Sequence, residues 1–120
     1  MTRIERRAAE LRDRPGGVVE LFDYVLAMQS EYRSLGQVLA AAGIAWFTGL
    51  ADRTVAAFAP LVERARADGA VHPGVGVADV MLAFSMAGGA LADNDLAGRP
   101  EVGDRLRGML HRALFTEGYR

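Results

Sequence analysis

An uncharged stretch at positions 80–92, VMLAFSMAGGALA, constrains the fold more than any other feature of the sequence. On a helical wheel Met81 and Phe84 lie on one face and Met86 lies nearly opposite, so both faces are apolar. A helix that is hydrophobic all round is buried all round, and the other helices of a 120-residue chain can cover only one of its faces. The second face therefore predicts contact with another molecule.

Apolar residues recur at helical spacing along most of the chain, and no segment shows the alternation that is typical of a strand. Gly69 is a stop signal for one long helix, and Pro100 is a start signal for the last. The expected fold class is all-α, a six-helix bundle. The predicted helices span residues 2–13, 18–32, 34–43, 44–68, 77–92 and 100–114.

The composition argues against several classes of function. The formal net charge is −1, so the chain has no basic excess with which to hold nucleic-acid phosphates. Without cysteine it forms neither disulfides nor thiolate metal sites, and His72 and His111 lack a second ligand at metal-binding spacing. We expect no enzymatic activity and no cofactor. We expect His111 to be solvated near its helix end, and contact with a partner across the last helix is the alternative.

The hydropathy pattern bears on location. The longest apolar run is shorter than the ~20 residues that span a bilayer, and residues 1–14 have no apolar core that could act as a signal. The absence of cysteine gives no reason to expect an oxidising compartment. The sequence therefore predicts a cytoplasmic protein with no membrane partner.

Aromatic, methionine and polar residues on the apolar stripes of three predicted helices have the composition of a small-molecule site, which is mostly apolar with a few polar groups. A packed core is the alternative, since the Thr54 hydroxyl can bond to the Leu50 carbonyl on its own helix. Gln29 is harder to satisfy locally when it is buried. The predicted ligand-binding residues are Phe22, Val25, Met28, Gln29, Tyr32, Trp46, Phe47, Thr54, Phe58, Met81, Phe84 and Ser85.

The last two predicted helices are candidates for a homodimer interface. Two such helices from each protomer would form a four-helix bundle. Gly88 and Gly89 each lower helix stability by roughly 1 kcal/mol relative to alanine, which is explained if a partner's backbone comes close. Fraying of the helix end is the alternative. The predicted interface residues are Leu82, Met86, Gly89, Leu106, Met109, Leu110 and Ala113.

Residues 60–84, PLVERARADGAVHPGVGVADVMLAF, resemble a junction in the C-terminal domains of tetracycline-repressor-like (TetR) transcriptional regulators. In that family a helix with a proline ends in "ERA…GA", and a loop with a proline leads to an acidic helix start and a dimerising helix pair. The likeness in helix order extends from Thr2 to Leu114, nearly the whole chain. It implies that residues 1–120 are a single C-terminal regulatory domain that binds an effector and dimerises.

The TetR family carries an N-terminal helix-turn-helix, and residues 1–120 begin at what resembles the fourth helix of the family. The resemblance thus implies that the DNA-binding domain is absent from this chain. Operator DNA would be bound only through that N-terminal domain. The resemblance implies a regulator, a repressor that a small, mainly apolar effector releases by shifting the linking helix. The alternative is a stand-alone helical dimer that carries or sequesters a hydrophobic small molecule.

Overall fold

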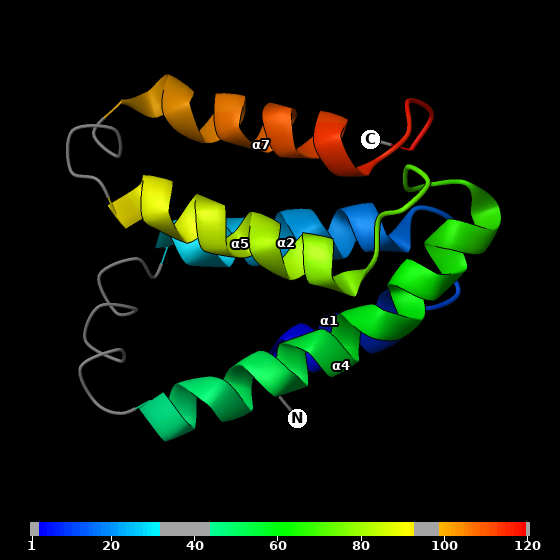
Figure 1. Ribbon diagram of the computed structural model, residues 1–120, viewed down its shortest axis with the longest axis horizontal. Coiled ribbons are helices and arrows are strands. Elements are labelled where there is room, and N and C mark those ends of the chain that lie inside the picture. Colours follow the sequence, from blue (N-terminus) through cyan, green and yellow to red (C-terminus); the bar gives the residue numbers. More distant parts are fainter. Residues whose placement is uncertain (1–2, 32–43, 93–98, 120) are drawn as a thin grey trace.

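Five α-helices make up most of the computed structural model, which describes residues 3–31, 44–92 and 99–119 (Figure 1). The all-α prediction is confirmed for this part of the chain. The helix predicted at residues 34–43 lies outside the described residues. The described helices are α1 (Arg3–Leu11), α2 (Gly17–Glu31), α4 (Ile44–Asp68), α5 (Val77–Ala92) and α7 (Pro100–Leu114).

Local end signals explain where α4 stops and α5 starts. Gly69 follows α4 with a φ of 77°, the Ala70 N–H donates to the Ala65 carbonyl at 2.8 Å, and the Gly69 N–H donates to the Arg66 carbonyl at 3.4 Å. This pair of bonds is a Schellman motif, so the stop predicted at Gly69 is confirmed. At the start of α5, Asp79 accepts a hydrogen bond from the backbone N–H of Gly76 at 2.8 Å, which caps the first turn.

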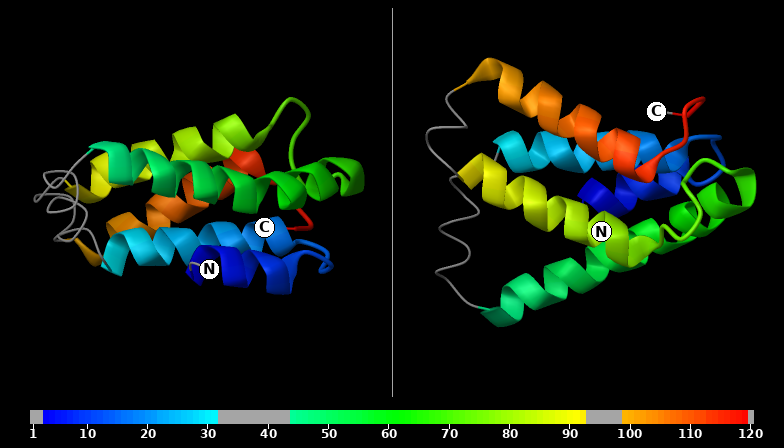
Figure 2. Two further views of the ribbon diagram at one scale, coloured as in Figure 1. Left: turned by 90° about the horizontal axis from the view of Figure 1, so that it is seen from below. Right: turned by 45° about the horizontal axis from the view of Figure 1, so that its top comes forward.

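Helix α2 lies at the centre of the bundle, because it contacts each of the other four described helices. The remaining contacts join α1 to α4, α4 to α5, and α5 to α7. Figure 2 shows α1 beside α2 on one side of the molecule and α4 with α5 on the other. Residues between α2 and α5 are therefore held in place by packing against α4 and α7 as well.

The residues after α7 fold back onto the turn between α4 and α5, and we call this arrangement the C-terminal clasp (residues 68–72 and 114–119). Val71 and Phe115 form an isolated antiparallel bridge. The His72 N–H donates to the Leu114 carbonyl at 3.0 Å, and the Thr116 hydroxyl donates to the Gly69 carbonyl at 2.6 Å. The clasp thus ties the end of α7 to the end of α4.

Gly17, the first residue of α2, is buried where the end of α1 crosses it. A Cβ atom at this position would overlap the Leu11 carbonyl oxygen and would lie 3.3 Å from the Leu11 Cβ. We expect Gly17→Ala to lower the free energy of unfolding by about 1–3 kcal/mol, because a backbone group has to move. Urea unfolding followed by circular dichroism measures this loss.

Gly103 is the matched control, because it lies in α7 with open space around the position of its missing Cβ. Gly103→Ala should raise the free energy of unfolding by up to about 1 kcal/mol through helix propensity. Equal effects of the two substitutions would contradict the close approach at Gly17.

Candidate functional site

Three predicted site residues from three helices meet in the core. The Phe22 ring of α2 is stacked on the Phe84 ring of α5, with centroids 5.0 Å apart. Phe58 of α4 approaches the same Phe84 ring at 5.4 Å. All three side chains are buried. The three rings therefore meet by direct contact, and no space for a ligand separates them.

Gln29 of α2 is joined to α5 by the nitrogen of its side-chain amide. Its Nε2 donates to the Phe84 carbonyl at 3.1 Å. A Cβ atom added to Gly88, one turn further along α5, would lie 3.9 Å from that nitrogen. Gln29 therefore reaches from α2 to α5 beside one of the small residues of the uncharged stretch.

The other half of the Gln29 amide is an unpaired acceptor. Gln29 Oε1 is buried and has no hydrogen-bond donor within the described part of the chain. An unsatisfied buried acceptor costs about 1–3 kcal/mol, and such groups in native proteins usually bond to protein, ordered water or a ligand. Gln29 Oε1 is thus the polar atom of the candidate site at which a ligand could donate a hydrogen bond.

The other described residues of the predicted pocket differ in how exposed they are. Ser85, predicted in the pocket, instead lies exposed on the outside of α5, where its hydroxyl donates to the Met81 carbonyl at 3.3 Å. It follows Phe84 directly and so points about 100° away from the buried face. Val25 is buried, whereas Met28, Thr54 and Met81 are half-buried.

Three residues of the predicted pocket are not described by the structure. Tyr32 lies outside the described residues, and the side chains of Trp46 and Phe47 in α4 do as well. The site prediction for these aromatic residues stays a prediction.

Two surface hollows lie away from the predicted pocket. One, of about 10 Å³, lies where the turn after α1 meets α4. The other, of about 190 Å³, is lined by residues of α1 and by Tyr24 of α2. Both are smaller than the roughly 300–1,000 Å³ of ligand pockets. The ligand pocket of that size remains a prediction.

The predicted interface residues largely face outward. Leu82 and Met86 of α5 are 58% and 53% exposed, and Met109 of α7 is 61% exposed. Gly89 and Ala113 are exposed and Leu106 is half-buried. We call the exposed residues Leu82, Met86, Gly89, Met109 and Ala113 the apolar outer face.

Leu110, predicted at the interface, instead belongs to the core of the chain, where it is 6% exposed. It lies one turn before Leu114, which is also buried. Met109 precedes Leu110 by about 100° on the helix and is therefore turned outward. Helix α7 thus has two apolar stripes, and only one of them is open to a partner.

His111 is buried, so the expectation of a solvated histidine is wrong. The residue is 9% exposed, because it lies between Leu110 and Leu114 on the inner stripe of α7. His111 Nε2 lies 2.5 Å from the Asp23 carboxylate oxygen Oδ1 of α2. The imidazole ring also packs edge-on against Phe115 at 5.3 Å. This pair links α7 to the central helix α2.

The described residues add two negative findings. In residues 3–31, 44–92 and 99–119, no three histidine, aspartate or glutamate side chains are grouped so that they could hold a metal ion. None of the helices in these ranges has the length and apolar character needed to cross a membrane.

Comparisons of the chain with protein-family models, with curated proteins and with solved structures gave no match. The resemblance to TetR-like C-terminal domains therefore rests on residues 60–84 and on the helix order. The function of the chain has to be inferred from its own geometry.

Proposed function

We propose that the chain is the effector-binding and dimerisation domain of a TetR-like transcriptional regulator, a repressor that a small, mainly apolar ligand releases from DNA. The observation that carries this proposal is the double role of α5. Its inner side carries Phe84, whose carbonyl accepts a hydrogen bond from the Gln29 side chain. Its outer side carries the exposed residues Leu82 and Met86. One helix thus joins the candidate ligand site to the candidate interface.

The apolar outer face supports a two-fold dimer. Large apolar side chains grouped on adjacent helices of a soluble protein usually mark a contact with another chain. Helices α5 and α7 contact each other, so a second copy would complete a four-helix bundle. No described atom comes within 4 Å of the position of a Gly89 Cβ, which leaves room for the backbone of the partner. A specific interface of this kind buries roughly 1,600 Å² in total.

The unpaired acceptor of Gln29 supports ligand binding. A guest with one hydroxyl or N–H group would satisfy Gln29 Oε1, while its apolar body would contact apolar side chains of the helices around it. Since the same amide is bonded to α5, a guest that changes this bond shifts the dimer helices directly. Such a ligand acts by binding one of two dimer arrangements more tightly than the other.

The experiment for ligand binding uses 2-naphthol, an apolar molecule with one hydroxyl donor, and 2-methoxynaphthalene, which lacks the donor. We expect the chain to bind 2-naphthol about tenfold more tightly, because a donor to a buried acceptor contributes roughly 1–2 kcal/mol. In Gln29→Leu the difference between the two probes should disappear. Fluorescence titration measures both affinities.

Ser85→Ala is the matched control, because it removes an exposed hydroxyl from α5 and should leave both affinities unchanged. The ligand-binding part of the proposal is wrong if neither probe binds, or if Gln29→Leu keeps the preference for 2-naphthol.

A further inference from the structure

A basic hollow of about 190 Å³ lies between α1 and α2 and is lined by Arg3, Arg6, Arg7, Glu10 and Tyr24. The four charged residues are spaced i, i+3, i+4 and i+7, so they form one stripe along α1. Tyr24 adds a half-buried ring from α2. We propose that this hollow binds a small oxyanion, either a phosphate or a carboxylate group. The inference is independent of the proposed regulatory function.

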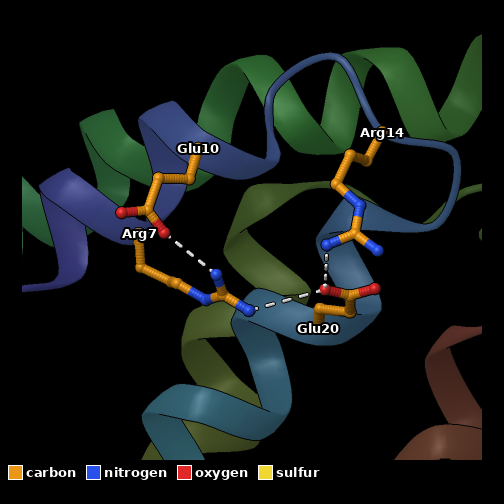
Figure 3. A network of polar contacts seen from close by, with 4 residues as sticks. All are labelled: Arg7, Glu10, Arg14 and Glu20. Carbon is orange, nitrogen blue, oxygen red and sulfur yellow. Dashed lines mark hydrogen bonds and ion pairs between the residues drawn. The ribbon is translucent and has the colours of Figure 1, made fainter.

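An ion-pair network holds one side of the hollow in place (Figure 3). Arg7 lies 2.9 Å from Glu10 and 3.6 Å from Glu20, and Arg14 lies 3.2 Å from Glu20. Two arginines and two carboxylates balance one another in this network. A guanidinium has five N–H groups in a rigid fork, so Arg7 is oriented by its carboxylates and still has donors left for a ligand.

Arg6 supplies the positive charge that the network does not neutralise. Its side chain is exposed, and within the described residues it has no carboxylate partner. The neighbouring Glu5 is paired with Arg53 of α4 at 3.1 Å. Since the network of Arg7 and its carboxylates is balanced, Arg6 gives the lining a positive charge that this network does not neutralise.

The rim formed by Arg3 and Tyr24 indicates the size and type of the ligand. The Arg3 guanidinium carbon lies 6.0 Å from the centroid of the Tyr24 ring, within the range of a cation–π contact. The hollow is smaller than the roughly 300–1,000 Å³ of a drug-sized site, so it suits one anionic group. The planar forks of arginine match phosphate and carboxylate oxygens, and this geometry favours an oxyanion over a halide.

The test is a titration of the ¹⁵N-labelled chain with inorganic phosphate, with chloride at the same ionic strength as the reference. We expect saturable shifts of the amide resonances of α1 with phosphate and smaller, unsaturable shifts with chloride. Arg6→Gln should raise the Kd for phosphate about tenfold, since one charge-assisted hydrogen bond is lost. Arg12→Gln, at an exposed arginine of the same region outside the hollow, should leave the Kd unchanged.

A second arm with phenyl phosphate and acetate distinguishes the sources of the anion. Tighter binding of phenyl phosphate that Tyr24→Leu abolishes identifies an aromatic phosphate as the ligand. Equal binding of phosphate and phenyl phosphate identifies the free ion, and tighter binding of acetate identifies a carboxylate. The inference is overturned if phosphate and chloride give the same shifts, or if Arg6→Gln and Arg12→Gln weaken binding equally, because only general electrostatic screening would then be acting.

Discussion

Phe22→Ala is expected to lower the free energy of unfolding by about 3–5 kcal/mol, the range for removing a buried aromatic ring. Phe22 is fully buried, stacks on Phe84 and meets Phe115 edge-on at 5.3 Å. It also lies on α2, which contacts all the other described helices, so the cavity would open at the centre of the bundle. Urea unfolding at a fixed protein concentration measures the loss, since the stability of a dimer depends on concentration.

Phe22→Leu is the control, because it keeps part of the apolar volume and should lose clearly less than the alanine variant. Substitutions at surface positions usually change stability by about 0.5 kcal/mol or less. A loss of that size for Phe22→Ala would contradict the packed aromatic core.

The second large effect concerns assembly. We expect the chain to sediment as a dimer at micromolar concentration. Met86→Glu should raise the dimer Kd by roughly a hundredfold, because the substitution places a charge in the proposed apolar interface. Met86 is 53% exposed within the chain, so the substitution should leave the folded protomer intact. Sedimentation equilibrium of both proteins measures the Kd.

Ala56→Glu is the matched control, since Ala56 is exposed on α4 and lies outside the apolar outer face. Gly89→Leu gives a sharper version of the same test. Because a Gly89 Cβ meets open space within the chain, weaker assembly in this variant would come from the partner, and Ala90→Leu should weaken assembly less. A monomeric wild-type chain would refute the dimer and with it the dimerisation part of the proposed function.

Local signals explain why the helix boundaries could be predicted from the sequence. The long helix ends at Gly69 and the last helix begins at Pro100, and both positions act on the backbone within one helical turn. The helical wheel likewise separated Phe84 from Met86, which the structure places on opposite sides of α5. These features depend on neighbours along the chain, so no tertiary information was needed.

Contacts between distant segments explain what could not be predicted. The Gln29 amide bonds to a residue 55 positions away, and His111 finds Asp23 at a separation of 88. Helical periodicity shows that α7 has two apolar stripes, but which stripe faces its own core depends on how α7 meets α2. For this reason the sequence alone places Leu110 at the interface and His111 in solvent, whereas both belong to the core.

The C-terminal clasp has a mechanical consequence for α5 and α7. It ties the end of α7 to the turn from which α5 starts, so a change in the angle between these two helices that leaves the clasp in place would displace the far end of α5. At 1.5 Å per residue, the 16 residues of α5 form an arm about 24 Å long, and a rotation of about 5° displaces its far tip by about 2 Å. Gly88 and Gly89 lie near that tip, as does the unpaired acceptor of Gln29. The displacement caused by a small rotation about the clasp would therefore be largest at these glycines, which lie on both the inner and the outer side of α5.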